Sequence, residues 1–229
     1  MNIKVQQHLE NCLDCKLFTD KKTNEPLKHH KVPNHCWETV AVDLFGPLPS
    51  RNHIIVVQDL ASRFPVAKLV KSTSASAVLP ALGETYDIMG NPENQISDNG
   101  PPFNSSMMQS FADKRNINLQ KTPPYHPTAN PAETFMKPLG KAMKIAVQNK
   151  TPEKKAVQEL LENYRDTPHP ATGVPPNAFL FRHQHQTKFP RRELSQNEVE
   201  NAKERDEKSK SIRTENINTS KYKKRMTLK

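Results

Sequence analysis

The sequence predicts an α/β fold with one core of ordinary size. Runs of β-branched and apolar residues at 37–45, 53–59 and 66–70 are typical of strands. The turns between these runs are short and favour an antiparallel meander. Helical spacing of apolar residues follows at 72–88 and from 104 onward, with two short strands expected at 95–97 and 117–120.

Length and composition limit the class of protein. The chain has 229 residues, of which 34% are hydrophobic, and its mean hydropathy of −0.81 indicates that part of it is not packed. It has no long apolar run, so no membrane span is expected, and its first residues do not form a signal peptide. Three cysteines, an odd number, argue against a disulfide framework and for a reducing compartment.

The charge distribution favours a polyanionic partner. The net charge is +10, and residues 191–229 carry 12 Lys and Arg against 7 Asp and Glu. This tail is therefore far more basic per residue than the rest of the chain. A basic balance indicates nucleic acid as partner, and an ordinary solvated surface is the alternative.

The N-terminal segment contains half of a zinc-binding pattern. Cys12 and Cys15 form a Cys-x-x-Cys pair, which supplies two of the four ligands of a tetrahedral zinc site. The nearby histidines and Cys36 have no matching spacing. A free cysteine pair or a truncated zinc knuckle is therefore favoured over a complete zinc module. Residues 20–36 are polar and are expected to form a linker.

The first strand contains a carboxylate. In the strand expected at 37–45, Asp43 shares a face with Trp37, Thr39 and Ala41. A carboxylate in a buried strand is costly unless it is paired or bound to a metal, which makes Asp43 a functional candidate. Asp59, at the end of the next strand, is interpreted as a turn residue.

Asp98 ends the strand at 95–97, and Asn99-Gly100-Pro101 then breaks it. Taken alone, this stretch favours a turn former over a ligand. The helix that follows is expected to bury a stripe of apolar residues, namely Met107, Met108, Phe111 and Ala112.

Glu133 is the third acidic candidate. It follows a proline-rich loop at 122–129, in the first turn of a helix that Asn130 and Pro131 are expected to start. The same helix carries a basic stripe at i, i+4 and i+7, formed by Lys137, Lys141 and Lys144. A kink is expected at Pro138. After further helices from 151 and at 177–181, residues 193–215 are expected to form a solvated helix and the remainder to be disordered.

Three carboxylates at element ends suit a hard divalent cation. Mg²⁺ prefers carboxylate oxygens and keeps substrate phosphates or waters in its other positions. Two such ions can activate the attacking oxygen and stabilise the leaving one in an in-line phosphoryl displacement. A nuclease or transferase acting on a polyanion needs this combination of an acidic cleft and basic surroundings.

The motifs together resemble a retroelement integrase core of the Ty3/gypsy-like type. The resemblance covers residues 37–182 and rests on four stretches in the same order as in that family. These are Trp37…Asp43-Leu44-Phe45-Gly46-Pro47, Val56-Val57-Gln58-Asp59, Ser97-Asp98-Asn99-Gly100 and Tyr125-His126-Pro127…Glu133. In addition, Thr172–Arg182 resembles the segment that closes the core, and Cys12-x-x-Cys15 resembles the second half of the His-His-Cys-Cys zinc module.

The resemblance implies an RNase H-like fold, with a mixed five-stranded sheet flanked by helices. It implies that Asp43, Asp98 and Glu133 ligate two Mg²⁺ or Mn²⁺ ions for 3′-end cleavage of DNA and strand transfer. It places Tyr125, His126 and the three lysines near DNA, and it implies a homodimer or higher oligomer through the core. Zn²⁺ is not expected in this chain, and no membrane contact is expected.

Three regions are expected: a zinc-module remnant with linker at 1–30, the core-like domain at 31–190 and the basic tail at 191–229. Asn130-Pro131-Ala132-Glu133 is one residue shorter than the Asn-Gly-x-x-Glu of many members. The incomplete flanking modules suggest an element-derived protein or an incomplete gene product. The alternatives are therefore a domesticated binding protein without catalysis and a simple RNase H-like nuclease. The basic run Lys221–Arg225 is a candidate nuclear-targeting signal, although a plain basic tail is the favoured interpretation of it. The expected localisation is nuclear, with cytoplasmic as the alternative.

Overall fold

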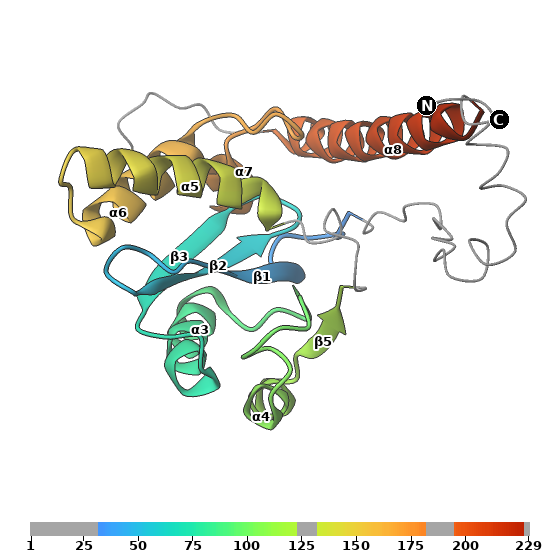
Figure 1. The fold of residues 1–229 in the computed structure, drawn as a ribbon. Coiled ribbons are helices and arrows are strands. Elements are labelled where there is room, and N and C mark those ends of the chain that lie inside the picture. Colours follow the sequence, from blue (N-terminus) through green and yellow to red (C-terminus); the bar gives the residue numbers. More distant parts are fainter. Residues whose placement is uncertain (1–31, 123–131, 182–194, 227–229) are drawn as a thin grey trace, which may run out of the picture. The chain divides into compact units, whose positions relative to one another are not determined.

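The computed structural model describes residues 32–122, 132–181 and 195–226, with only the backbone of Glu133 and of residues 217–226. The chain divides into two compact units. One is His29–Arg213, and the other combines Met1–Lys28 with Thr214–Lys229, of which only the helical residues 214–226 are described. The first unit contains the sheet and both of its helical layers (Figure 1). Within the described ranges, no helix is both long and apolar enough to cross a bilayer.

The first unit is built on a mixed five-stranded sheet in the order β3-β2-β1-β4-β5. The strands are β1 (Thr39–Phe45), β2 (His53–Asp59), β3 (Pro65–Val70), β4 (Asn94–Ser97) and β5 (Asn118–Lys121). β1, β2 and β3 form the antiparallel meander, whereas β4 joins β1 in parallel and β5 joins β4 in parallel. The expected mixed sheet flanked by helices is thereby confirmed.

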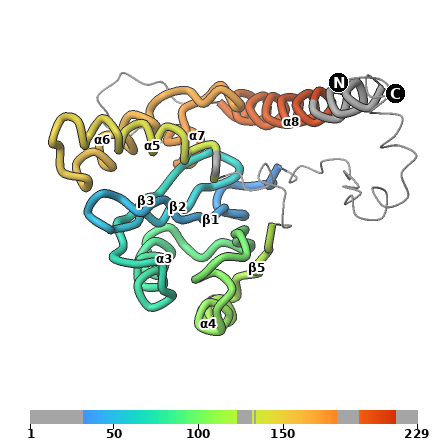
Figure 2. Tube along the Cα trace, in the orientation of Figure 1, coloured from blue at the N-terminus to red at the C-terminus, as the bar shows by residue number. Residues whose placement is uncertain are grey.

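Helices cover both faces of this sheet. Figure 1 shows α3 (Ala75–Met89) and α4 (Ser106–Arg115) on one face, and α5 (Glu133–Gln148) and α6 (Glu153–Asp166) on the other. The colour gradient in Figure 2 shows the same order, because the green segments lie below the blue strands and the yellow segments above them. The short helix α7 (Pro176–Phe181) and the long helix α8 (Gln196–Met226) follow.

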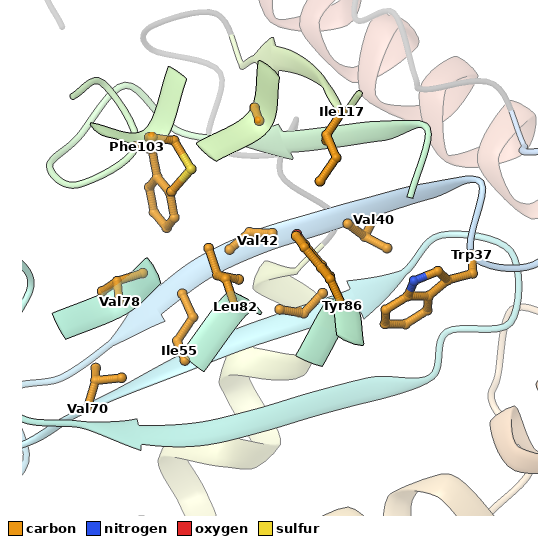
Figure 3. Close-up of a cluster of buried hydrophobic side chains, with 13 residues drawn as sticks. Trp37, Val40, Val42, Ile55, Val70, Val78, Leu82, Tyr86, Phe103 and Ile117 are labelled. Atoms are coloured by element: carbon orange, nitrogen blue, oxygen red, sulfur yellow. The ribbon is translucent and has the colours of Figure 1, made fainter. Parts of the chain in front are cut away.

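The larger core lies between the sheet and helices α3 and α4. Val40 and Val42 point from β1 toward Leu82 and Tyr86 of α3 (Figure 3), and all four side chains are buried. The hydroxyl of Tyr86 donates to Gln95 Oε1 at 2.7 Å, so the polar tip of this tyrosine has a partner. The expected alternation is confirmed within β1, since Val40 and Val42 face this core and Ala41 faces the opposite layer. It was wrong for Trp37, which was expected on the Ala41 face and lies in this core instead, because it precedes β1 and has a positive φ of 65°.

The second core lies under α5 and α6. Phe135, Leu139 and Met143 repeat at i, i+4 and i+8 along α5 and pack on Ile54 and Val56 of β2. The helix is continuous from Glu133 to Gln148 with Pro138 inside it. This packing fixes α5 across the sheet with its first turn near β1, which positions the site described below.

Two local expectations differ from the structure. Met107 is expected from the sequence in the buried stripe of α4, but this residue is 51% exposed, whereas Met108 and Ala112 are fully buried. The short helix meets the core along a narrow stripe, so a residue one position away faces solvent. Helix α5 begins at Glu133 with Ala132 at its N-cap position, a few residues later than expected.

Asp59 is a structural turn residue, as interpreted from the sequence. Its carboxylate accepts hydrogen bonds from the Ser62 hydroxyl (2.5 Å), the Ser62 N–H (2.9 Å) and the Trp37 N–H (3.0 Å). Burial raises the pKa of this carboxyl, and the bonds from Ser62 and Trp37 oppose the rise. Asp59 therefore ties the entry of β1 to the turn between β2 and β3.

The N-terminal half of α8 is packed against this unit. Val199 and Ala202 are buried with Val174 and Phe179. Next to this cluster, Arg63 Nη2 donates to both carboxylate oxygens of Asp206, at 2.7 and 2.6 Å. Residues 196–213 therefore belong to the same compact unit as the sheet. The helix itself extends to Met226, beyond the helical segment expected to end at 215.

His169, beside this ion pair, makes folding sensitive to mild acid. Burial lowers the pKa of His169 from 6.5 to about 4, Arg63 adds to the fall, and Asp206 opposes it. The neutral ring fits its surroundings, because the Ala171 N–H donates to Nδ1 at 3.2 Å, a bond that a protonated Nδ1 cannot accept.

We expect the free energy of unfolding to fall by up to about 3 kcal/mol as the pH falls from about 6.5 to about 4. In that window the unfolded chain binds a proton at His169 and the folded chain does not, so acid favours unfolding. Urea unfolding across this range measures the effect. In His169→Gln the acid-dependent loss should shrink by a similar amount, and an unchanged pH profile in that variant would contradict the assignment.

Candidate active site

Asp43 lies in β1, and Asp98 is the residue that follows the neighbouring strand β4. β1 and β4 are parallel, with Thr39, Val40 and Ala41 opposite Asn94, Gln95 and Ile96. Asp43 follows Ala41 by two residues and Asp98 follows Ile96 by two, so continuing the register places the two acids opposite each other. Paired strands lie about 4.8 Å apart. Extending the register thus brings two residues separated by 54 others in the sequence to the same end of two inner strands.

Backbone bonds orient both carboxylates. The Leu44 N–H donates to Asp43 Oδ1 at 2.8 Å, and the Gly100 N–H donates to Asp98 Oδ1 at 3.1 Å. Asp43 is half-buried and Asp98 is exposed. Asp98 therefore forms a turn and also presents a carboxylate at the strand end, so the two interpretations of this residue are compatible.

The packing of Ala132 brings the start of α5 close to the ends of β1 and β4 that carry the two acids. Ala132 is fully buried in a small cluster with Ala41, Ile96 and Leu60. Ala41 and Ile96 are the residues two positions before Asp43 and Asp98, and Ala132 directly precedes Glu133. All three acids are therefore within two residues of one apolar cluster. The backbone of Glu133 is described and its side chain is not.

Lys121 is a site residue that the sequence did not indicate. It is the last residue of β5, opposite Ser97 of β4, and its Nζ donates to the Phe103 carbonyl at 2.5 Å. Burial lowers the pKa of Lys121, and the neighbouring charge of Asp98 opposes the fall. This lysine supplies positive charge beside Asp98 and fastens the loop that follows it. Only the pairing of β4 with β5, which no local pattern shows, would have indicated it.

The end of β5 also holds the Asp98 loop through its backbone. The Thr122 N–H donates to the Ser97 carbonyl at 3.0 Å, and Asn99 Nδ2 donates to the Thr122 carbonyl at 3.3 Å. Residues 123–131, which connect this point to α5, are outside the described ranges. Thr122, the last described residue before this connection, is therefore hydrogen-bonded to the residues on both sides of Asp98.

The three predicted lysines of α5 are exposed and line one groove. Lys137, Lys141 and Lys144 border a depression of about 580 Å³ between α5 and the chain that leaves β1. Its other lining residues are apolar or glycine, and they include Phe45, Leu48, Met136 and Met143. The predicted basic stripe is therefore a structural feature of the helix face that begins one turn after Glu133.

Other predicted site residues fall outside the described part of the chain. These are Tyr125 and His126 of the proline-rich loop and Cys12 and Cys15 of the N-terminal segment. Among the described side chains, no group of three or more His, Cys, Asp or Glu could hold a metal ion. The described side chains do not include that of Glu133, so this result concerns Asp43 and Asp98 without their expected third ligand.

Comparisons with known sequences identify relatives among retroelement polyproteins. No protein-family model matches the chain. An uncharacterized protein of Caenorhabditis elegans is 27% identical over 168 residues, covering 73% of this chain and 13% of that protein. The Pro-Pol polyprotein of simian foamy virus type 3 is 30% identical over 127 residues, covering 53% of this chain and 11% of the polyprotein. A transposon Tf2 polyprotein of Schizosaccharomyces pombe is 26% identical over 133 residues, covering 54% of this chain and 10% of the polyprotein.

Solved structures with the same fold are retroviral integrases. A chain of the simian T-cell lymphotropic virus intasome, solved with the PP2A regulatory subunit B56 gamma, aligns with a TM-score of 0.59 and 18% identity. That alignment covers 84% of this chain and 71% of the other. The HTLV-2 integrase catalytic core domain, solved with magnesium in a trimeric form, aligns with a TM-score of 0.52 and 18% identity over 63% of this chain and 95% of the core.

The fold and the relatives agree with the order of the motifs. The chain spans only about an eighth or less of the curated relatives it matches, so it corresponds to one segment of each polyprotein. In this chain the corresponding residues form a mixed five-stranded sheet flanked by helices, as in the HTLV-2 integrase core. The protein is a homologue of retroelement polyproteins and has the fold of a retroviral integrase catalytic core.

Proposed function

We propose that this protein is an integrase-type polynucleotidyl transferase core, in which Asp43, Asp98 and Glu133 hold two divalent ions, Mg²⁺ or Mn²⁺. The observation that carries the proposal is the convergence of three acids on the cluster of Ala41, Ile96 and Ala132. The magnesium complex of the HTLV-2 core, a protein of the same fold, supports it.

The residues present fit such ions. Carboxylate oxygens are the ligands that Mg²⁺ prefers, and Asp43 and Asp98 are held in place by the bonds from Leu44 and Gly100. Two bound ions supply activation of the attacking oxygen and stabilisation of the leaving oxygen in an in-line displacement. The protein itself fixes the carboxylates of Asp43 and Asp98 at the same end of two inner strands, and Lys121 fastens the Asp98 loop through the Phe103 carbonyl.

The proposed substrate is DNA, cleaved near its 3′ ends and then joined to a second duplex. The homologous polyproteins and the intasome neighbour support this substrate, and so do the net charge of +10 and the lysine row on α5. We further propose assembly of the core into a homodimer or higher oligomer, and action in the nucleus. Zinc has no part in the proposed reaction.

Metal-dependent cleavage of a branched or nicked duplex tests the function. Purified protein with Mn²⁺ should nick or resolve the branched substrate, and with EDTA it should not. Binding of the same DNA should be measured in parallel by fluorescence anisotropy. A protein that binds DNA tightly and is inert with every divalent ion would instead favour the domesticated, non-catalytic alternative.

The lysine row should set the salt dependence of DNA binding. Replacing Lys137, Lys141 and Lys144 by Gln should weaken binding of all sequences alike, because binding of lysine to phosphate releases counterions without reading bases. The slope of log K against log salt should fall by roughly 0.9 for each phosphate that is no longer neutralised. Lys114→Gln on α4, an exposed lysine on the other side of the sheet, is the matched control. If the triple variant has the wild-type salt slope, these lysines do not contact the DNA phosphates and the prediction is wrong.

A further inference from the structure

Lys121 uses its charge on a neutral group of the loop that carries Asp98. Its Nζ donates to the carbonyl oxygen of Phe103 at 2.5 Å, although Lys121 is an exposed residue at the end of β5 and could extend into water. Ordering a lysine side chain costs rotamer freedom, which a charge-assisted hydrogen bond offsets. The bond therefore ties the end of β5 to residues 98–103, which we call the Asp98 loop.

Consecutive residues at the end of β5 hold the Asp98 loop at two points. Lys121 holds the Phe103 carbonyl, and the carbonyl of Thr122 accepts a hydrogen bond from Asn99 Nδ2 at 3.3 Å. The ring of Phe103 is buried in the larger core (Figure 3), and its N–H donates to the Gly100 carbonyl at 3.0 Å. The loop is thus fastened to β5 on both sides of Gly100.

The direction of the Asp98 carboxylate depends on this loop. The Gly100 N–H donates to Oδ1 at 3.1 Å, and a Cβ added at Gly100 would meet Oδ2 at 3.1 Å. Both carboxylate oxygens therefore lie against the backbone of Gly100, so a displacement of the loop displaces them. These contacts link the Lys121 ammonium through Phe103 and Gly100 to the carboxylate.

We infer that Lys121 is a positioning residue on which Mg²⁺ binding at the acidic site depends more than Mn²⁺ binding does. The inference rests on the proposed function and adds a choice between its two ions. Mg²⁺ demands near-ideal octahedral geometry, with oxygen ligands at about 2.0–2.1 Å. Mn²⁺ is larger and accepts a wider range of ligand positions, so a carboxylate on a loosened loop should weaken Mg²⁺ binding more than Mn²⁺ binding.

The charge of Lys121 has a different effect from its hydrogen bond. Its ammonium is close enough to Asp98 for the two charges to interact, so removal of the charge alone would strengthen binding of any divalent cation. Mg²⁺ and Mn²⁺ carry the same charge, so this effect cancels in the ratio of their affinities. A change in that ratio therefore reports the geometry of the site and not its electrostatic potential.

Three variants separate the hydrogen bond from the charge. Lys121→Met keeps the apolar stem and loses the donor, whereas Lys121→Arg keeps both a donor and the positive charge. Lys114→Met removes one exposed lysine from α4 and is the control for net charge. For each protein, Mn²⁺ affinity is measured by electron paramagnetic resonance and Mg²⁺ affinity by competition with bound Mn²⁺. Hydrogen exchange of the Phe103 amide is followed in the metal-free protein, with Tm as the control for folding.

In Lys121→Met the Phe103 amide should exchange at least about tenfold faster than in wild type, because the loop loses a hydrogen bond from a charged group. Its Mg²⁺ affinity should fall about 10–100-fold relative to its Mn²⁺ affinity, the range for loss of an outer-shell partner of a metal ligand. Lys121→Arg should stay close to wild type in both quantities, and Lys114→Met should match wild type.

A wild-type ratio of Mg²⁺ to Mn²⁺ affinity in Lys121→Met would overturn the inference. An equal fall of the ratio in Lys114→Met would also overturn it, because net charge would then be the cause. Nicking of the branched duplex, measured on the same proteins, tests the proposed function separately. A wild type that shows the expected affinities and no nicking would contradict the proposed function and leave the role of Lys121 standing, whereas a wild type that binds neither ion would overturn both.

Discussion

Asp43→Asn should abolish metal-dependent DNA cleavage without unfolding the protein. The amide has the same shape as the carboxylate, and its oxygen can still accept the Leu44 N–H that now donates to Oδ1 at 2.8 Å. It loses the charge that a hard divalent cation requires. Loss of an outer-shell partner alone typically costs 10–100-fold in metal affinity, so loss of a direct ligand should cost more than about 100-fold.

Asp98→Asn should behave in the same way, because the Gly100 N–H can donate to the amide oxygen as it does to Asp98 Oδ1. The measurement is the rate of nicking at several Mn²⁺ concentrations, with DNA binding and Tm as controls for folding. Asp113→Asn, an exposed acid on α4, should cleave at the wild-type rate. Cleavage by Asp43→Asn or Asp98→Asn at the rate of the Asp113 control would contradict the assignment of these ligands.

The largest effect on stability is expected at Asp206. Its side chain is 2% exposed and that of Arg63 is 10% exposed, with the two in contact at 2.6 Å. Lys210 Nζ lies 3.1 Å from the same carboxylate. Burial alone would raise the pKa of Asp206, but Arg63 and Lys210 outweigh it and hold the pKa below 3.8. Asp206→Ala would leave two cations facing each other in a buried place.

We expect Asp206→Ala to lower the free energy of unfolding by about 3–5 kcal/mol, the range for breaking a buried ion pair. Urea unfolding measures it. Glu204→Ala, which removes an exposed partner of Lys208, should stay within about 0.5 kcal/mol of wild type. Arg63→Met combined with Asp206→Leu should recover part of the loss, since it removes both charges of the buried pair and leaves only Lys210, whose side chain is 18% exposed, without the carboxylate. Equal stabilities of the Asp206 and Glu204 variants would show that α8 is not anchored by this pair.

The stabilisation from Asp206 should also depend on pH in a defined direction. Its folded pKa is depressed, so its contribution is present above the unfolded value of about 3.9 and is lost as the pH falls through the folded value. This loss begins below the window in which His169 acts, so the two groups can be separated in one pH series.

The features that the sequence predicted correctly depend on residues close together in the chain. The alternation in 37–45 correctly assigned Val40 and Val42 to one face and Ala41 to the other, because strand side chains repeat every two residues. It misplaced Trp37, which lies before the first residue of β1. The same rule cannot show which strands pair, so the role of Lys121 beside Ser97 was not predicted.

The features that the sequence did not predict depend on contacts between residues far apart in the chain. Arg63 and Asp206 are 143 residues apart, and nothing near either residue indicates the other. The charged composition of 191–229 predicted a solvated or disordered tail, whereas Val199 and Ala202 bury a narrow face of α8. Two small apolar residues and one ion pair are too weak a sequence signal to distinguish a docked helix from a solvated one. Met107 shows the same limit, since helical spacing gives a stripe but not its width.

The central claim is that the three acids form one metal site, and its most direct measurement is anomalous X-ray scattering from crystals soaked in Mn²⁺. The account predicts two Mn²⁺ ions about 3.5–4 Å apart, bound by the carboxylates of Asp43, Asp98 and Glu133. It also predicts that the peaks vanish in Asp43→Asn crystals. Mn²⁺ bound elsewhere, with no peak between Asp43 and Asp98 in a protein that still cleaves DNA, would contradict it.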